Sequence, residues 1–340
     1  MHRWLLDILI CPSCRSDAPL QARVERGEGD AIEEGTLTCA SCARTDPVRR
    51  GTPRFVSVEE DYCGNFGFQW QRWKAVQIDR LGGHHLSESR FFDETPWDRD
   101  WMKGKLILEA GCGAGRFTDV AAQYGGRIVA CDLSEAIDAC HDLTRIHGDL
   151  VQTVQASIYA LPFREGTFDA AFCFGVIQHT PDPKLTMESI PHFVREDGLL
   201  AYDFYEKTPW ERSWVPRWWL RRFTPEWSRE RLLLLSHVLT AIFFVPAWLI
   251  AQLRPTRIYL PGLPIAMYTD PALSIADEYR WTVLNTYDWY GPKFELRQDF
   301  REVARLLSGL GLQDIIARPG VVTARIRRRV PPPERAGELR

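Results

Sequence analysis

The sequence has no excess of charge of either sign. Its 42 lysines and arginines are balanced by 45 aspartates and glutamates, so the formal net charge at pH 7 is −3. Proteins that bind nucleic acid through its phosphates usually carry a strongly basic surface. The charge balance therefore argues against bulk RNA or DNA as a partner.

The first residues lack a secretory signal. Asp7 interrupts the apolar run that begins at Trp4, whereas a signal peptide needs an apolar stretch of about 7 to 15 residues. The nine cysteines are odd in number, which together with the missing signal favours free thiols over disulfides. We expect a cytoplasmic protein, with a peripheral position at a membrane surface as an alternative.

Four of the cysteines form two C-x-x-C pairs. Cys11 and Cys14 are separated from Cys39 and Cys42 by 24 residues, a pattern that can hold one tetrahedral Zn²⁺ through four thiolates. The metal would replace the hydrophobic core that so small a module can hardly build. We predict a structural zinc module over residues 1–58 that unfolds alone when Cys39 is lost. The alternative to a metal site is that the four cysteines are unrelated buried residues. Between the two pairs, the polar stretch 25–35 is expected to be a solvated loop.

The centre of the chain has a strand, a glycine turn and a helix in succession. Residues 106–108 are an apolar run typical of a buried parallel strand, and Gly111, Gly113 and Gly115 follow at alternate positions. Residues 116–124 have helical periodicity, so the free N–H groups of the helix N-terminus face whatever lies over the glycines. This arrangement is typical of a nucleotide-cofactor loop.

The loop lacks the G-x-G-x-x-G spacing that admits a pyrophosphate. Glu109 at the strand end would repel a diphosphate, but it suits the ammonium and sulfonium groups of S-adenosylmethionine (SAM). After the next strand, residues 127–130, come Asp132 and Leu133. Asp132 is 21 residues beyond Gly111, where a carboxylate can accept both ribose hydroxyls.

Four segments in this order resemble the class I SAM-dependent methyltransferases. They are Leu-Glu-Ala-Gly-Cys-Gly-Ala-Gly-Arg, Ala-Cys-Asp-Leu-Ser, Ala-Leu-Pro-Phe-Arg-Glu-Gly-Thr-Phe-Asp and Gly-Val-Ile-Gln-His-Thr-Pro-Asp-Pro, and they lie in a core of residues 105–205. The resemblance implies an α/β fold with a Rossmann-like sheet of seven strands, mostly parallel and ending in an antiparallel hairpin. A glycine turn in another doubly wound enzyme is the alternative.

The resemblance also implies the remaining cofactor contacts. The acid that commonly follows the third strand is replaced here by Ser157. Its hydroxyl and the N–H of Ile158 are expected to contact the adenine instead. Phe174 and Gly175, at the end of the fourth strand, are expected beside the methionyl arm.

His179 is the candidate general base, because imidazole titrates near neutrality. The alternative is that it shapes its loop. Weaker substrate candidates, on other loops, are Tyr205, Asp288 and Tyr290. Residues 59–104 form an aromatic linker in which Gln69 and Trp70 are candidates for a cofactor lid; an aromatic docking surface is the alternative there.

The first module has a resemblance of its own. Residues 5–14 and the closing segment 47–53 resemble the zinc-ribbon family that serves as the activator subunit of tRNA and release-factor methyltransferases. The resemblance implies a small antiparallel sheet over the metal, with its last strand over residues 53–58.

Residues 206–290 exceed what the minimal fold needs and are predicted to be a helical insertion. Five tryptophans among arginines precede the apolar run 232–253. This run approaches the length of a membrane span, but Pro246 interrupts it and a crossing would divide one domain. We expect a lid or a homodimer surface, with peripheral membrane contact through residues 210–253 as the alternative. Residues 291–327 should return to the core as a helix and a hairpin, and residues 328–340 should be disordered.

The expected function is methyl transfer from SAM to oxygen or carbon of a small molecule. Sugars, lipid-linked compounds, quinones and natural products remain open as acceptors. Two alternatives belong to other classes: an enzyme that modifies tRNA or protein, and a catalytically inactive SAM-binding partner protein.

Overall fold

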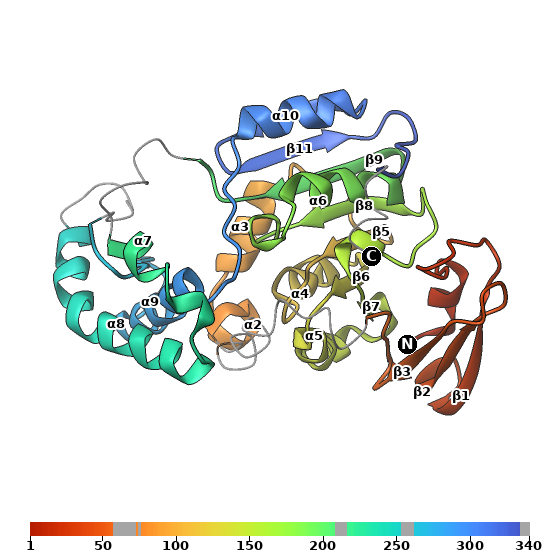
Figure 1. Ribbon diagram of the computed structural model, residues 1–340, viewed down its shortest axis with the longest axis horizontal. Helices are drawn as coiled ribbons and strands as arrows, with labels where there is room; N and C mark the ends of the chain where they lie inside the picture. Colours follow the sequence, from red (N-terminus) through yellow and green to blue (C-terminus); the bar gives the residue numbers. More distant parts are fainter. Residues whose placement is uncertain (57–72, 74–75, 208–215, 253–261, 334–340) are drawn as a thin grey trace. The chain divides into compact units, whose positions relative to one another are not determined.

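The computed structural model describes residues 1–56, 73, 76–207, 216–252 and 262–333. The chain forms two compact units (Figure 1). Unit 1 comprises Met1–Tyr62, Ser87–Glu206 and Phe294–Arg340, and unit 2 comprises Cys63–Leu86 and Lys207–Lys293. The lid candidates Gln69 and Trp70, and most of the tail predicted to be disordered, lie outside the described residues.

The N-terminal part of unit 1 is a four-stranded antiparallel sheet, which we call the ribbon. A short 3-10 helix, η1 (Arg3–Asp7), precedes strands β1 (Leu20–Glu28), β2 (Ala31–Cys39), β3 (Thr45–Arg49) and β4 (Thr52–Pro53). The expectation of a solvated loop over residues 25–35 is wrong, because β1 and β2 pair as a hairpin whose turn contains Gly29. The polar side chains of β1 are exposed on this hairpin, and its large buried aliphatic side chains are Leu20, Ile32 and Leu37.

The rest of unit 1 is built on a seven-stranded sheet. Across the sheet the strands have the order β10-β11-β9-β8-β5-β6-β7. Their bounds are β5 (Leu106–Ala110), β6 (Arg127–Asp132), β7 (Val151–Gln155), β8 (Phe168–Cys173), β9 (Val194–Asp203), β10 (Gln313–Arg318) and β11 (Val321–Arg325). Only β11 runs antiparallel to its neighbours, so the predicted sheet with an antiparallel hairpin is confirmed.

Helices cover both faces of this sheet. One hydrophobic cluster joins it to α3 (Leu86–Glu94), α4 (Arg116–Gln123) and α5 (Ala136–Thr144), and the other joins it to α6 (Pro183–Ser189) and α10 (Phe300–Gly309). Strands enclosed in this way must be apolar on both sides, as the uninterrupted run in β5 predicts. The connections include four 3-10 turns: η3 (Arg145–Leu150), η4 (Ile158–Ala160), η5 (Ile177–His179) and η6 (Pro191–Phe193).

The ribbon continues the seven-stranded sheet beyond β7. Arg54, just after β4, forms a parallel bridge with Gln155, and the Phe55 N–H donates to the Gln155 carbonyl at 2.8 Å. Leu5 and Leu9 of the ribbon belong to the same hydrophobic cluster as the sheet. The ribbon therefore contributes to the core of unit 1 and is not a separate globule.

Unit 2 is helical. It contains α2 (Asp79–Gly82), α7 (Pro216–Leu220), the 3-10 turn η7 (Thr224–Glu226), α8 (Arg229–Gln252) and α9 (Ile275–Tyr290). The helical insertion predicted after the fifth strand is confirmed, but no separate helix was predicted at α9. The sequence does contain an N-cap residue for α9, because the Ser274 side chain accepts a hydrogen bond from the Asp277 N–H. Its aromatic residues pack inside unit 2, with Tyr287 at 5.5 Å from the Trp73 ring.

Among the described residues one helix, α8, has the length and composition of a membrane span. Its most apolar window has a mean hydropathy of 2.1, and only 22% of that window is buried. Length and hydropathy alone do not distinguish a span from other apolar helices.

Candidate functional site

The glycine loop connects β5 to α4 at the carboxyl edge of the sheet. The Gly111 N–H donates to the Cys131 carbonyl at 2.7 Å, which ties the loop to the neighbouring strand β6. Gly111 has a φ of 86°, and a Cβ there would lie 2.3 Å from Val176 Cγ2. Gly115 has a φ of 88° and would meet the Cys140 sulfur at 2.9 Å. Both glycines are therefore needed for the loop to close against its own protein.

Glu109 and Asp132 are the two acids of the loop. Glu109 is 2% exposed and accepts a hydrogen bond from Thr118. Burial, together with the nearby charge of Asp132, raises the pKa of Glu109 well above its usual range. Two close carboxyl groups of this kind favour a cationic ligand, which would lower that pKa. The loop thus fits the ammonium and sulfonium of SAM.

Asp132 ends β6 and organises the loop around it. One carboxylate oxygen accepts from the Gly113 N–H at 2.8 Å, and the other accepts from the Ser134 N–H at 2.8 Å and hydroxyl at 2.7 Å. The residue is partly exposed, as is Leu133 beside it. A carboxylate oxygen can accept more than one hydrogen bond, so ribose hydroxyls can be added to this set.

The residues expected at the adenine lie after β7. Ser157 is the N-cap of η4, and its hydroxyl accepts from the Tyr159 N–H at 3.3 Å. Ile158 follows inside the turn and is buried. Both residues lie at the same edge of the sheet as Asp132, since β6 and β7 are parallel neighbours.

Phe174 and Gly175 follow β8 and face different environments. The Phe174 ring is buried among aromatic side chains, at 5.4 Å from the Phe117 ring. Gly175 is exposed and has a φ of 71°. Only Gly175, with the Phe174 backbone, is placed to meet a ligand.

Sequence reasoning missed a charged cluster beside Gly175. Asp203, the last residue of β9, accepts from the Gly175 N–H and from the Arg90 guanidinium. Arg90 Nε also donates to Glu94 Oε1 at 2.8 Å, so one arginine of α3 bridges two carboxyl groups. The signal in the sequence was an acid at the carboxyl end of a parallel strand, but its charged partner Arg90 is 113 residues away in the chain.

Glu94 holds a proton at higher pH than an ordinary glutamate. Burial, opposed by the Arg90 charge and reinforced by that of Asp203, raises its pKa to about 7. Its Oε2 is buried and has no hydrogen-bond partner among the described residues. The side chain therefore fits the neutral, protonated form.

We predict that Glu94 makes the stability of the chain depend on pH. Because the folded state binds this proton more tightly than the unfolded state, the free energy of unfolding should fall as pH rises from about 4.5 to 7. Glu94→Gln should remove that fall, which we expect to be roughly 2 kcal/mol. Urea unfolding of both proteins at pH 5 and pH 8 measures it. Glu188→Gln, which removes a carboxylate 3.6 Å from Lys184, is the control. An equal change in the free energy of unfolding between pH 5 and pH 8 in all three proteins would contradict the prediction.

His179 lies in η5, after β8, and is 7% exposed. Its Nδ1 donates to the Phe294 carbonyl at 3.0 Å, because a carbonyl can only accept. In neutral imidazole Nε2 is then the nitrogen that can take a proton. The Tyr205 ring lies 5.6 Å from the His179 ring. These two predicted residues are brought together on the same side of unit 1.

Asp288 and Tyr290 belong to α9 of unit 2. Tyr290 is fully buried, and its hydroxyl donates to the Pro264 carbonyl at 2.9 Å. This contact makes it a packing residue of unit 2. Asp288 is partly exposed.

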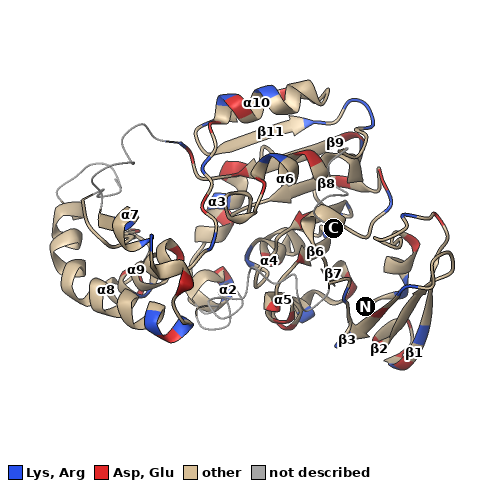
Figure 2. Cartoon of the chain, viewed as in Figure 1, with Lys and Arg blue, Asp and Glu red and all other residues tan. Residues whose placement is uncertain are grey.

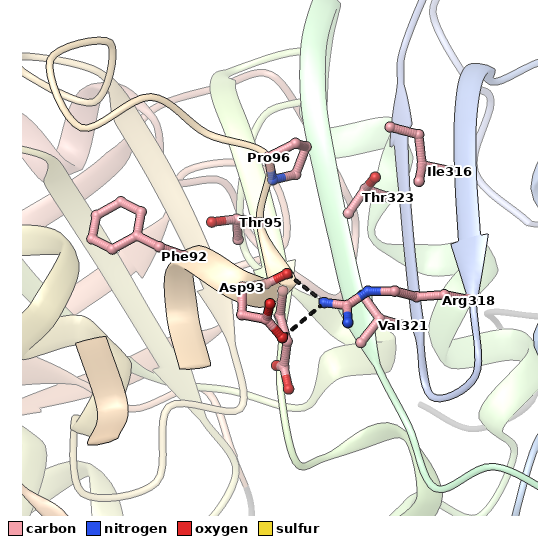
Figure 3. Close-up of a pocket in the computed structure, with 9 residues that line it drawn as sticks. Phe92, Asp93, Thr95, Pro96, Ile316, Arg318, Val321 and Thr323 are labelled. Carbon is pink, nitrogen blue, oxygen red and sulfur yellow. Dashed lines mark hydrogen bonds and ion pairs between the residues drawn. The ribbon is translucent and has the colours of Figure 1, made fainter. Parts of the chain in front are cut away.

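A small pocket lies next to the charged cluster. It is formed by the end of α3 and the β10–β11 hairpin, where Arg318 donates to the backbone carbonyl and the carboxylate of Asp93 (Figure 3). Glu94 is one of its lining residues. Because Val321 pairs with Asp203, the pocket is at the carboxyl edge of β9.

The four ribbon cysteines converge on one point. Their sulfur atoms all lie within 4.8 Å of one another, and the Cys11–Cys42 and Cys14–Cys39 separations are both 3.6 Å. Four sulfurs at about 2.3 Å from a tetrahedral Zn²⁺ would be about 3.8 Å apart. The thiol geometry therefore fits the metal that the sequence predicts.

Both cysteine turns end in the same way. The residues after them, Arg15 and Ala43, have φ values of 53° and 60°, and their N–H groups donate to the carbonyls of Cys11 and Cys39. Arg15 also donates to the Leu161 and Phe163 carbonyls at 2.7 and 3.1 Å. The first turn is thereby bound to the seven-stranded domain.

Comparison with known proteins identifies both parts of unit 1. Residues 108–202 match the methyltransferase domain family, and residues 2–51 match the Trm112p-like protein family. The ubiquinone biosynthesis O-methyltransferase of Bordetella avium is 26% identical over 163 residues, which cover 45% of this chain and 64% of that protein. That of Alkalilimnicola ehrlichii is 24% identical, with 48% and 66% covered. The chain thus spans less than two thirds of the length of these relatives.

Solved methyltransferases also resemble the chain. A SAM-dependent methyltransferase from Aquifex aeolicus has a TM-score of 0.41 at 12% identity, covering 76% of this chain and 98% of its own. A complex of the Haloferax volcanii Trm112 methyltransferase activator and a methyltransferase has a TM-score of 0.35 at 18% identity, covering 44% and 63%. Together with the glycine loop and the strand order, the two family matches show that unit 1 combines a methyltransferase domain, residues 108–202, with a Trm112p-like ribbon ahead of it.

Proposed function

We propose that the chain transfers the SAM methyl group to an oxygen atom of a small molecule. The observation that carries the proposal is a set of four ionisable side chains near the expected methyl position. His179 and Tyr205 follow β8 and β9, Asp203 ends β9, and Glu94 at the end of α3 shares Arg90 with Asp203. A hydroxyl acceptor must lose its proton when its oxygen takes the methyl group, and a base beside the acceptor can receive that proton.

The proposed cofactor site uses the loop residues in the roles that the sequence suggests. Glu109 and the Gly111–Gly115 backbone would bind the methionyl end, and Asp132 the ribose. Leu133, Ser157 and Ile158 would hold the adenine, with Gly175 beside the sulfonium. SAM supplies the electrophilic methyl group when bound, and the protein's part is to align acceptor and sulfur in a site without water.

We propose Zn²⁺ as the ion of the four ribbon cysteines. All four ligand positions of a tetrahedral ion are taken by thiolates, so no position remains for substrate or water. The metal is therefore structural. Its role is to fix the ribbon that extends the sheet at β7.

The names of the curated relatives suggest phenolic or quinone-like acceptors for this chain. The same chemistry is compatible with other small hydroxylated molecules. We favour a small acceptor over tRNA because the overall charge of −3 supplies no basic field for phosphates. A cytoplasmic location, with the membrane contact argued below, is part of the proposal.

The proposal is tested by incubating the purified chain with methyl-labelled SAM and a panel of catechols, hydroxyquinones and sugars. Formation of S-adenosylhomocysteine and of a product heavier by one methyl group is expected with a hydroxylated acceptor. Binding of SAM without turnover on any acceptor, including total tRNA and protein extract, would favour the inactive partner protein. Turnover only on tRNA or on protein would show that the acceptor is a macromolecule and not a small molecule.

With an acceptor in hand, His179→Gln should lower kcat by about 10²- to 10⁴-fold, which is the usual contribution of a general base. SAM affinity should not change, because His179 donates to Phe294 and not to the cofactor loop. Steady-state kinetics and calorimetry measure the two quantities. Tyr205→Phe is the companion variant, since it keeps the ring beside His179 and removes only the hydroxyl. A normal kcat in His179→Gln would leave the histidine as a residue that shapes its loop.

A further inference from the structure

The exposed face of α8 is apolar over most of its length. Between residues 232 and 251 every exposed position is apolar: Leu234, Val238, Ala241, Ile242, Val245, Pro246, Leu249 and Ile250. Their spacing of three or four residues places them on one side of the helix. Five of these side chains are between 46% and 66% exposed. Figure 2 shows charged residues of α8 only at its N-terminal end.

The opposite face of α8 packs inside unit 2. Leu232, Ser236, Thr240, Phe244 and Ala247 are buried. Phe244 lies 5.1 Å from the Tyr279 ring of α9, and Trp248 Nε1 donates to Glu278 at 2.8 Å. A membrane crossing would carry α9 into the bilayer with the exposed Arg280 and its partner Asp277. Only the outer face of α8 is therefore available to an apolar environment.

Aromatic and cationic side chains are exposed just before this face. Trp219, Phe223 and Trp227 are 66%, 65% and 36% exposed, and Arg222, Arg229 and Arg231 are exposed in the same segment. Tryptophan and arginine are the residues that favour the headgroup layer of a membrane.

Not every arginine of this segment is available. Arg217 is 1% exposed, with its guanidinium 4.2 Å from the Trp289 ring centre. Arg221 donates to the Trp289 and Pro292 carbonyls at the end of α9, at 2.7 and 2.8 Å, where a cation is favoured by the helix dipole. These two arginines hold unit 2 together. The other three are exposed beside two exposed acids, Glu226 and Glu230, so the exposed charges of the segment sum to +1.

We propose that α8 and the segment before it bind the surface of an anionic lipid bilayer. The helix, about 36 Å long, lies in the membrane plane with its outer face among the acyl chains and Arg222, Arg229 and Arg231 at the headgroups. A protein partner fits less well, because protein interfaces usually need a hydrogen bond for every 100 to 200 Å² or so. Every exposed side chain between Leu234 and Ile250 is apolar, and the polar residues of that stretch, Ser236, His237 and Thr240, are buried or half-buried. This inference does not depend on methyl transfer.

Flotation of the full chain with phosphatidylcholine vesicles, with and without phosphatidylglycerol, tests the proposal. The intact chain should float with the anionic vesicles and less with the neutral ones, and added salt should weaken the difference. Ile242→Glu should lower the partition coefficient about tenfold or more, since an apolar contact is lost and a charge must be dehydrated. Arg229→Glu combined with Arg231→Glu should abolish the preference for anionic lipid.

Two matched controls separate lipid binding from general effects. Ile316→Glu introduces the same charge at an isoleucine of unit 1 that is 61% exposed, against 59% for Ile242, and should float like the intact chain. Circular dichroism should be unchanged in both variants. Absence of flotation at low salt, or equal flotation of Ile242→Glu and the intact chain, overturns the proposal. Light scattering that shows a dimer broken by Ile242→Glu, without vesicle binding, would also overturn it and assign the face to a second copy.

Discussion

Replacement of Cys39 by serine should unfold all of unit 1 rather than the ribbon alone. Structural zinc contributes on the order of 10 kcal/mol or more to the folding of small ribbons, which is comparable with the whole stability of a domain, about 5 to 15 kcal/mol. The sequence suggested that only the ribbon would be lost. The structure changes that expectation, because Leu5, Leu9 and Leu37 share one hydrophobic cluster with the sheet.

The measurement is a comparison of zinc content, near-ultraviolet circular dichroism and SAM binding in the intact chain and the variant. We expect metal, tertiary signal and SAM binding to be lost together. Ser41→Ala is the matched control, since it changes the same cysteine turn and removes only an exposed hydrogen bond to Ser16. Metal-free Cys39→Ser that still binds SAM would show that the seven-stranded domain folds without its ribbon. Absence of metal in the intact chain, purified without chelator, would count against zinc altogether.

Asp132→Ala should weaken SAM binding by about 1.5 to 3 kcal/mol, through loss of charge-assisted hydrogen bonds to the ribose. The substitution should also loosen the glycine loop and so weaken binding further, because the same carboxylate accepts from the Gly113 and Ser134 N–H groups. Calorimetric titration with SAM and with S-adenosylhomocysteine measures the change.

Ser134→Ala separates the two contributions to this loss. It removes the hydroxyl that donates to Asp132 at 2.7 Å but leaves the carboxylate in place. Its effect should be a small part of the Asp132→Ala effect. Equal losses in the two variants would mean that Asp132 acts only by holding the loop, and unchanged affinity in Asp132→Ala would refute the cofactor assignment.

The features predicted from the sequence are those encoded over short distances. The strand, glycine turn and helix around Gly111 span about a dozen residues, and each cysteine turn spans four. Their backbone conformations follow from local residue types, such as glycine at positive φ. For this reason the glycine loop, the sheet class and the cysteine cluster were predictable.

The features that were missed depend on long-range contacts. Arg90 reaches Asp203 across 113 residues, and His179 reaches Phe294 across 115. The β1–β2 hairpin was missed because its outer strand is polar along most of its exposed length. In α9, nine of sixteen residues are buried, so its periodicity does not stand out from the sequence.

The bridge between Arg54 and Gln155 places the ribbon against the edge of the seven-stranded sheet. β7 is the last strand of the seven-stranded sheet, and all five of its residues are buried. An uncovered strand edge tends to pair with strands of other molecules. Here its cover is part of the same chain, so dilution cannot separate the two and one ribbon is always supplied for each seven-stranded sheet. The effective local concentration of the cover is then set by chain length instead of by expression level.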